Sequence, residues 1–375
     1  MKILQILPSL DDGGVERGTV DSNRIYVASG HESWVISAGG KRVAEIETDG
    51  GKHLTLDVKS KNPLTAFPRA MALRRAIRSI RPDIIHFRSR VPGWLTLWAN
   101  AASDLKLPVI STMHGLNHPC FYSSVMVRAD RVICVSSAGL AFVQANYPWV
   151  NAQKLQIIPR GVDIDTFSSE KLDHAWMEEF CNHYQLHRKF VATVVGRVSA
   201  LKGIDTLVRA AALLKTQLPE LTILVVGGPQ KNQEHVFDDL HTLAKELDVH
   251  DRVHFTGSQR KIPEIAALSS VVCSCNTKKP ESFGRTVAEA LAMNTPVVAA
   301  KHGGVLDIIR EGIDGFFFEP GNAEALADAL LKIKNTEFGD LRSHIVEHFT
   351  AECLAEKTLA IYSNVLEHRT SSALT

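Results

Sequence analysis

The sequence is poor in features that mark several classes of protein. Only 7% of its 375 residues are aromatic, so its core must be largely aliphatic. Six cysteines are scattered along the chain, too few for a disulfide framework, and no second Cys or His pair completes a zinc site around Cys273 and Cys275. No apolar run approaches the roughly 18–20 residues of a membrane-spanning helix, and the N-terminus lacks a signal-peptide pattern. These absences predict a cytoplasmic protein of a reducing compartment.

The net charge is only +1, which argues against a dedicated nucleic-acid binder, but the charge is unevenly distributed. Residues 1–163 contain 20 Lys and Arg against 13 Asp and Glu, a net of +7. The remainder contains 22 against 28, a net of −6. We therefore expect the first half of the chain to face an anionic partner.

The length and the rhythm of the apolar runs predict two domains of one fold class. Short Val, Ile and Leu runs, each followed by a segment of helical period, occur in both halves, at Ile3–Leu7, Trp34–Ser37, Ile84–Phe87, Val109–Thr112, Val132–Val135, Leu155–Ile158, Val191–Val195, Thr222–Val226, Val253–Thr256, Val271–Ser274, Val297–Ala299 and Phe316–Phe318. Continuous apolar runs interleaved with helices are typical of a parallel sheet buried on both faces.

We therefore expect two doubly wound α/β domains, residues 1–163 and 189–350, joined by a polar, His-rich linker at 164–188. Such folds bind nucleotides at the carboxyl ends of their strands, so we expect the functional site in a cleft between the two sheets. The C-terminal helix, about residues 351–367, is expected to pack back on the first domain.

Two cations follow the first strand of the second half. Gly196-Arg197-Val198-Ser199-Ala200-Leu201-Lys202-Gly203 lies between that strand and a helix. Helix N-terminal amides favour anions, and Arg supplies a planar fork while Lys supplies a point charge. Arg197 and Lys202 are therefore candidates for holding a diphosphate, or else two solvated cations on a loop.

Two carboxylates flank a second helix start. Pro280-Glu281-Ser282-Phe283-Gly284 precedes a helix that contains Glu289, and free backbone N–H groups at its start form another anion site. Eight helical residues would separate the two carboxylates by about 12 Å, more than the roughly 5–9.5 Å of hydrolytic pairs. Glu281 and Glu289 are therefore expected to act separately, each accepting hydrogen bonds from sugar hydroxyls.

These two constellations, in this order and spacing, resemble the retaining family-4 glycosyltransferases, which have the two-domain GT-B fold. Further matches along nearly the whole chain are Gly13-Gly14, Thr112-Met113-His114-Gly115, Ile158-Pro159-Arg160-Gly161-Val162-Asp163, Gly227-Gly228-Pro229, Phe255-Thr256-Gly257 and His302-Gly303-Gly304. The resemblance implies transfer of a hexosyl group from a nucleotide sugar, a UDP- or GDP-hexose, with retention and with no metal or other cofactor.

The resemblance also implies a role for each matching residue. Arg197 and Lys202 hold the diphosphate, Glu281 the donor sugar, Glu289 the ribose, and His114 lies beside the reacting sugar. Glu281, His114, Arg197 and Lys202 are thus the expected catalytic residues. The expected donor-binding set is Gly13, Gly14, Arg197, Lys202, Gly228, Arg260, Ile262, Glu281, Ser282, Phe283, Gly284 and Glu289.

Two positions depart from the family pattern. Asn294 stands where family members usually have Gly after the Glu289 helix, and Asn is the next-best residue for a left-handed position there. Arg160 stands where Asn is common; it is either a further contact to donor phosphate or acceptor, or a solvated hinge arginine. Asp163-Ile164-Asp165 matches the DxD of metal-dependent glycosyltransferases, but it follows no strand of a nucleotide site, so we expect no metal there.

The acceptor is expected at the carboxyl end of a strand in the basic domain. His86-Phe87-Arg88-Ser89-Arg90 and Trp94 suit an anionic, sugar-bearing acceptor, so we expect Arg88, Arg90, Trp94 and Arg160 to bind it. Residues 68–81 place five arginines away from an apolar helical face. This segment is either a sheet-packing helix with a solvated basic face or a patch facing an anionic membrane, which would favour a lipid-linked or lipopolysaccharide-core acceptor at the inner leaflet.

Two other functions fit the same residues. A nucleotide-sugar epimerase or hydrolase of this fold would release nucleotide without an acceptor, and a sensor would bind a sugar nucleotide without turnover. The presence of Arg197, Lys202, Glu281 and Glu289 together favours the transferase over the sensor.

Overall fold

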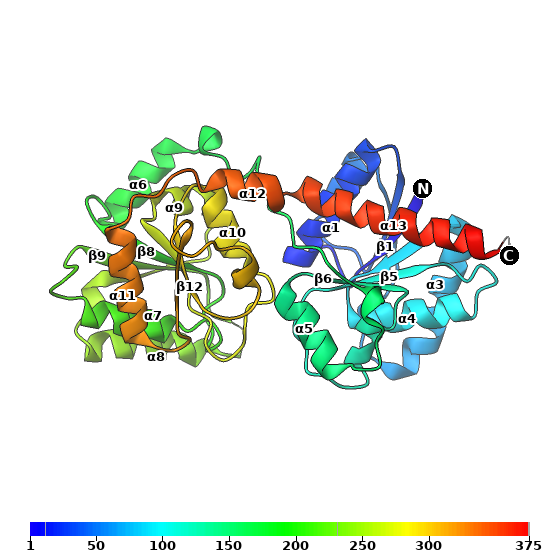
Figure 1. Cartoon of the computed structure of the whole chain (residues 1–375), viewed down its shortest axis with the longest axis horizontal. Helices are drawn as coiled ribbons and strands as arrows, with labels where there is room; N and C mark the ends of the chain where they lie inside the picture. The colour runs from blue at the N-terminus through cyan, green and yellow to red at the C-terminus, as the bar shows by residue number, and fades with distance from the viewer. Residues whose placement is uncertain (12, 231, 374–375) are drawn as a thin grey trace. The chain divides into compact units, whose positions relative to one another are not determined.

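A computed structural model of the protein describes residues 1–11, 13–230 and 232–373. The chain divides into two compact units (Figure 1). Unit 1 contains Met1–Gly161 and the C-terminal segment from Ala351, and unit 2 contains Val162–Thr350. Each unit is built around one parallel sheet with helices on both faces, so the expected α/β fold class is confirmed.

The sheet of unit 1 has seven strands in the order β3-β2-β1-β4-β5-β6-β7, and every pair is parallel. Their bounds are β1 Lys2–Ile6, β2 Glu32–Ser37, β3 Lys52–Thr55, β4 Ile84–Phe87, β5 Val109–Met113, β6 Arg131–Cys134 and β7 Leu155–Ile157. The apolar runs of the sequence correctly predicted six of these strands. They missed β3, a half-exposed edge strand of sequence KHLT, which has no apolar run because it is not buried on both faces.

Alternate residues of the unit 1 strands pack against different helices. Ile3, Ile84 and Ile110 contact the layer formed by α1 (Gly14–Ala28) and α13 (Ala351–Ala373). Leu4 and Ile85 face α3 (Ala66–Ile80) and α4 (Arg90–Ala101) on the other side. The remaining helical elements are α2 Val43–Thr48, α5 Ser137–Asn146 and the 3₁₀ turns Pro63–Thr65, Ser123–Val127 and Ala152–Lys154. The C-terminal helix thus belongs to the unit that holds the N-terminus (Figure 1).

The sheet of unit 2 has six parallel strands in the order β10-β9-β8-β11-β12-β13. The strands are β8 Phe190–Val195, β9 Leu221–Val226, β10 Val253–Gly257, β11 Val271–Ser274, β12 Val297–Ala300 and β13 Gly315–Phe318. The helices are α6 His174–Tyr184, α7 Ile204–Leu213, α8 Glu234–Glu246, α9 Ile262–Leu268, α10 Arg285–Ala292, α11 Ala323–Lys334 and α12 Arg342–His348, with 3₁₀ turns at Ser169–Lys171, His250–Arg252 and Gly304–Asp307.

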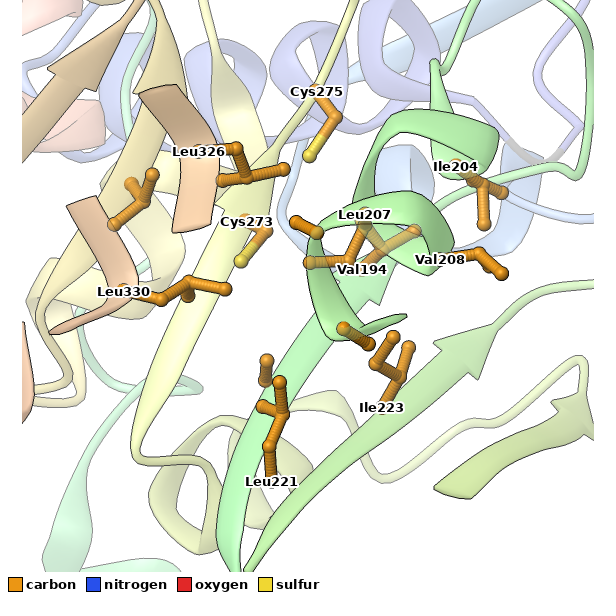
Figure 2. Close-up of a cluster of buried hydrophobic side chains, with 14 of the residues drawn as sticks. Val194, Ile204, Leu207, Val208, Leu221, Ile223, Cys273, Cys275, Leu326 and Leu330 are labelled. Atoms are coloured by element: carbon orange, nitrogen blue, oxygen red, sulfur yellow. The ribbon is translucent and has the colours of Figure 1, made fainter. Parts of the chain in front are cut away.

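The core of unit 2 lies between its sheet and the helices α7, α8 and α11. Figure 2 shows the side chains of α7 and α11 gathered against those of the strands, with Leu207, Val208, Leu326 and Leu330 on the helices and Val194, Ile223 and Cys273 on the sheet. Nearly all of this core is aliphatic, as the low aromatic content predicts. The six cysteines are free thiols.

Residues 164–188, which we expected to form a linker, instead belong to unit 2. Their helix, α6, buries Phe180 in a cluster with Leu224 and Ile265, on the sheet face opposite α7. The sequence of this segment is polar because α6 packs against the sheet through only a few aromatic side chains. Among them, Trp176 stacks on Phe180 with ring centroids 4.7 Å apart.

Asn294 has two roles that explain its departure from glycine. Its φ of 61° is left-handed, as expected for the residue after α10. Its side-chain oxygen also accepts hydrogen bonds from the backbone N–H of Leu341 at 2.8 Å and of Arg342 at 3.3 Å. Asn294 therefore caps the start of α12, which a glycine would leave without this acceptor.

Candidate functional site

The sheet of unit 2 reverses its winding between the neighbouring strands β8 and β11. The chain leaves β8 toward β9 on one side and leaves β11 toward β12 on the other, so the two loops diverge and open a crevice at their carboxyl ends. Lys202 follows β8 and Glu281 follows β11. The structure joins them: the Lys202 Nζ lies 3.2 Å from the Glu281 Oε2, and both side chains are about three-quarters buried.

Gly203 fixes the position of Lys202. It begins α7 with a left-handed φ of 60°, and a β-carbon there would lie 1.9 Å from the Cys275 carbonyl oxygen. Only glycine lets the two loops approach so closely. The Lys202 side chain in turn lies along Gly196, within 3.1 Å of where a β-carbon would be.

Arg197 is exposed on the same edge, in a loop that the next loop holds in place. The N–H of Val198 donates to the Gly228 carbonyl at 2.9 Å, and the N–H of Gln230 donates to the Val198 carbonyl at the same distance. Gly228 is therefore part of the support of the Arg197 loop. The Arg197 guanidinium itself projects into solvent, where an anion can reach it.

The Glu281 segment leads into α10 through Gly284, which has a left-handed φ of 105°. Gly284 is the N-cap residue of α10 and has no side chain to cap the helix, and the amides of a helix N-terminus favour an anion. Phe283 is buried and anchors this turn. Glu289 lies inside α10, is 8% exposed, and receives a hydrogen bond of 2.7 Å from the Arg285 Nε one turn earlier.

Arg260 and Ile262 follow β10 on the same edge of the sheet. Arg260 is exposed, and Ile262 begins α9. Between them, the Lys261 ammonium lies 3.1 Å from the Asp173 carboxylate and 3.4 Å from that of Glu264. These ion pairs fix the loop that carries the expected donor-binding residues Arg260 and Ile262.

The sheet of unit 1 has its own reversal, between β1 and β4. Gly13 and Gly14 follow β1 and start α1. The Glu16 carboxylate lies against the start of α1: a β-carbon on Gly13 would be only 2.2 Å from the Glu16 Oε2. Arg88 follows β4 on the other side of the reversal. Its Nη2 donates to the Gln5 Oε1 on β1 at 2.7 Å.

Arg88 is a buried cation, with only 5% of its surface exposed. Its Nε and the Gln5 Nε2 have no hydrogen-bond partner, and no carboxylate pairs with Arg88 anywhere in the described ranges 1–11, 13–230 and 232–373. Burying a charge without a partner costs free energy. An anionic ligand bound to the Arg88 guanidinium would offset this cost.

His114 follows β5 and is half-buried. Burial, reinforced by the positive charges of Arg160 and Arg88, holds the pKa of His114 well below 6.5. Its imidazole is therefore neutral near pH 7 and can accept as well as donate a hydrogen bond. Arg88, His114 and Arg160 thus share one electrostatic neighbourhood in unit 1.

Arg90 and Trp94, expected to bind acceptor, belong to a different surface. Arg90 lies over the Tyr122 ring, 5.1 Å from its centroid, and Trp94 donates from Nε1 to the Tyr122 carbonyl at 3.0 Å. Trp94 also stacks on Phe121 with ring centroids 5.1 Å apart. Both are held by this loop rather than by the residues around Arg88.

His86 is not available to an acceptor either, because it is completely buried. Its Nδ1 shares a hydrogen bond of 2.6 Å with the Tyr362 hydroxyl on α13, and its Nε2 shares one of 2.7 Å with the Thr112 hydroxyl. Burial holds the pKa of His86 well below 6.5. His86 therefore connects the C-terminal helix to β5, the strand that His114 follows.

Comparisons with known proteins identify the family of this chain. Residues 179–349 match the family model "Glycosyl transferases group 1", and residues 12–166 match "Glycosyltransferase Family 4". The chain is 30% identical over 345 residues to a D-inositol 3-phosphate glycosyltransferase of Kribbella flavida, covering 82% of this chain and 78% of the relative. It is a family-4 glycosyltransferase.

Solved structures of glycosyltransferases have the same fold as this one. A glycosyltransferase from Rickettsia africae has a TM-score of 0.84 at 28% identity, covering 97% of this chain and 98% of the other. The Anabaena protein HepE, solved in complex with UDP and glucose, has a TM-score of 0.80 at 23% identity, covering 97% and 100%. The expected GT-B architecture is thereby confirmed.

The described part of this family-4 chain contains no helix long and apolar enough to cross a membrane. The Asp163 carboxylate, in the DxD match, accepts hydrogen bonds from the N–H groups of Asp165 and Thr166 and from the Thr166 hydroxyl, so it stabilises a turn.

Sequence reasoning missed Gln5 and Arg285, since a glutamine inside an apolar run and an arginine one turn before Glu289 carry no distinct motif.

Proposed function

We propose that this protein transfers a hexosyl group from a UDP- or GDP-hexose to an anionic glycan or lipid-linked acceptor, with retention and without a metal. The observation that carries the proposal is the Lys202–Glu281 ion pair after β8 and β11 of unit 2, on the sheet edge that also carries the exposed Arg197 and the N-terminus of α10. Two cations and a helix N-terminus suit a diphosphate, and a carboxylate suits sugar hydroxyls.

Leaving-group stabilisation is the task of the cations. When the bond between the sugar and the diphosphate breaks, negative charge grows on the departing nucleoside diphosphate. Arg197, Lys202 and the α10 amides then interact more strongly with the transition state than with the donor, which is the condition for acceleration. Because Lys202 is held by its ion pair with Glu281, little reorganisation of this side chain is needed during the reaction.

The two carboxylates have different surroundings and we assign them different tasks. Glu281 lies at the crevice, paired with the diphosphate-binding Lys202, and would accept hydrogen bonds from the transferred sugar. Glu289 is buried within α10 and paired with Arg285, and would accept from the ribose. A carboxylate held by a salt bridge keeps a fixed direction for its remaining lone pairs.

The acceptor is proposed to bind in unit 1 through an anionic group. Arg88 supplies a buried positive charge that lacks a carboxylate partner within the described residues. Arg160 is a second cation whose charge acts on His114. The neutral His114 would orient the acceptor hydroxyl. The Kribbella flavida relative is named for a phosphorylated acceptor, D-inositol 3-phosphate, which supports an anionic acceptor here. We propose that the product enters a cell-surface polysaccharide, lipopolysaccharide included, at the inner face of the cytoplasmic membrane.

Nucleotide release tests this function against its alternatives. UDP or GDP release from each sugar nucleotide is measured with and without an anionic acceptor, D-inositol 3-phosphate being the first to try. A transferase shows acceptor-dependent release and a new glycoside, whose anomeric configuration by NMR reports retention. Equal release without acceptor indicates a hydrolase or epimerase. Thermal stabilisation by a sugar nucleotide without any release indicates a sensor.

A further inference from the structure

A groove of about 470 Å³ lies on unit 1, between the segment Ser60–Ala66, the helix α4 and the loop Phe121–Tyr122. We call it the aromatic groove. Its lining is mostly apolar and includes Val91, Trp94, Leu95, Trp98, Phe121 and Tyr122. The sugar-transfer residues lie elsewhere, around Arg88 and on unit 2, so the groove is not part of the site described above.

Large apolar side chains project into solvent around this groove. Leu64 is 88% exposed, Phe67 is 72% exposed and Phe121 is 74% exposed. Leu64 and Phe67 lie on the 3₁₀ turn and the start of α3 that form one wall of the groove, and Phe121 lines the opposite wall. Such a concentration of exposed apolar groups beside an apolar groove marks an interaction surface.

The charged side chains at the groove are cations. Lys61 and Arg69 line it, and none of the described residues that line it is a carboxylate. Arg128 lies over the Phe121 ring, 5.6 Å from its centroid, and over the Trp94 ring at 5.8 Å. An acid lies close to one of these cations: the Asp57 carboxylate is 3.9 Å from the Arg69 Nε. Aromatic rings with cations among them are typical of a membrane interface.

Two of the arginines of the segment 68–81, where the sequence suggested a membrane patch, have partners within unit 1. Arg69 donates to the backbone carbonyls of Ser60 and Asn62, and Arg78 lies 2.8 Å from the Asp104 carboxylate. These bonds shape the turn that presents Leu64. The apolar groups needed for insertion into a membrane therefore come from the turn and from the loop at Phe121, not from the arginine face of the helix.

We propose that the aromatic groove and its rim (Leu64, Phe67 and Phe121) form a docking surface for an anionic phospholipid bilayer, with Leu64, Phe67 and Phe121 inserted at the headgroup boundary and a lipid acyl chain in the groove. The exposed cations at the rim, Lys61 and Arg128, complement anionic headgroups. They also oppose pairing of two copies through this face, which would bring like charges together. This proposal concerns membrane binding alone and does not depend on the transferase reaction.

Vesicle binding by the full chain, without donor or acceptor, tests the proposal. We expect co-sedimentation with vesicles of phosphatidylcholine and phosphatidylglycerol, weaker binding to phosphatidylcholine alone, and quenching of tryptophan fluorescence by brominated lipid. The variant Leu64→Ser/Phe67→Ser/Phe121→Ser should lose binding by about tenfold or more, because each exposed apolar side chain contributes to insertion. Lys61→Glu should weaken binding only to the anionic vesicles.

The matched control replaces exposed apolar residues of unit 2. Leu213 and Ile313 are 50% and 56% exposed, so Leu213→Ser/Ile313→Ser removes exposed apolar side chains away from the groove and should bind vesicles like the wild type. Circular dichroism and thermal unfolding establish that both variants are folded. Failure to bind anionic vesicles, binding that is indifferent to lipid charge, or equal loss in the control variant would each overturn the proposal. So would self-association that the triple variant abolishes, because the face would then cover a second copy.

Discussion

The Lys202 ammonium and the Glu281 carboxylate form an ion pair of 3.2 Å although 79 residues separate them in the chain. Their strands, β8 and β11, are neighbours in the sheet, and the loops that follow them meet at the carboxyl edge. The pair keeps Glu281 oriented before substrate binds. It also couples the residue proposed for the diphosphate to the residue proposed for the sugar.

Lys202→Ala is expected to lower turnover by about 10²–10³-fold, or roughly 3–4 kcal/mol of activation free energy, through loss of a charge that stabilises the leaving diphosphate. Because Lys202 and Glu281 act as a pair, the loss in Lys202→Ala/Glu281→Gln should be smaller than the sum of the single losses. Initial rates for the four proteins of this cycle measure the coupling. Full additivity would show that the ion pair has no part in transfer.

Arg197→Ala is also expected to lower turnover by about 10²–10³-fold, through loss of a charge-assisted contact to the leaving diphosphate. Arg197 is exposed, so its removal should leave the melting temperature nearly unchanged. Lys245→Ala, at an exposed position of α8, is the matched control and should leave the rate unchanged. Near-normal turnover of Arg197→Ala would contradict the assignment of this residue to the leaving group.

Local sequence distinguishes the candidate residues of unit 2 more clearly than the contacts of unit 1. Arg197, Lys202, Glu281 and Glu289 belong to motifs in which a glycine, a helix start and a charged residue coincide, so local chemistry was enough to nominate them. The structure places Lys202 beside Glu281, and the roles of the four residues stay predictions. Gln5 and Arg88 meet only because β1 and β4 are neighbours at the sheet reversal, and strand order is not written in any local pattern. Trp94 lies after β4, as predicted, but its side chain lines the aromatic groove. The reason is that it stacks on Phe121, from a loop that local sequence does not place beside α4.

Glu281→Gln and Glu289→Gln should have different kinetic effects. Glu281→Gln, at the transferred sugar, is expected to depress kcat, whereas Glu289→Gln, at the ribose, should mainly raise the donor KM because that contact is the same in ground and transition states. Glu289→Gln also removes the charge paired with Arg285 in a nearly buried position, so its melting temperature should fall. Saturation curves for the donor measure both parameters. Equal losses of kcat in the two variants would refute this division of roles.

Acid is expected to destabilise unit 1 through His86. Its pKa is well below 6.5 in the folded protein because of burial, while the unfolded chain takes up the proton near pH 6.5. Below that pH the unfolded state binds more protons, so the free energy of unfolding falls as the pH drops, by up to about 1.4 kcal/mol per pH unit for one histidine. The contribution is complete above pH 6.5.

His86→Gln keeps hydrogen-bonding groups for Tyr362 and Thr112 but removes the titration. Denaturant unfolding of this variant between pH 7 and pH 5 should show a slope against pH that is reduced by about one proton. His118→Gln, at an exposed position, serves as the control. An unchanged slope in His86→Gln would show that the buried histidine does not control acid stability.

Chelation should leave the transfer rate essentially unchanged. Arg197 and Lys202 supply the positive charge that a metal supplies in DxD enzymes, and arginine stays protonated near neutrality with a reference pKa above about 12. The Asp163 carboxylate is engaged in its own turn, with the N–H of Thr166 at 3.0 Å and the Thr166 hydroxyl at 2.6 Å, so Asp163→Ala and Asp165→Ala should retain activity. Initial rates against EDTA, followed by magnesium or manganese add-back, measure this. Loss of activity on chelation that metal restores in the wild type, but not in Asp163→Ala/Asp165→Ala, would replace the two-cation mechanism with a metal-dependent one.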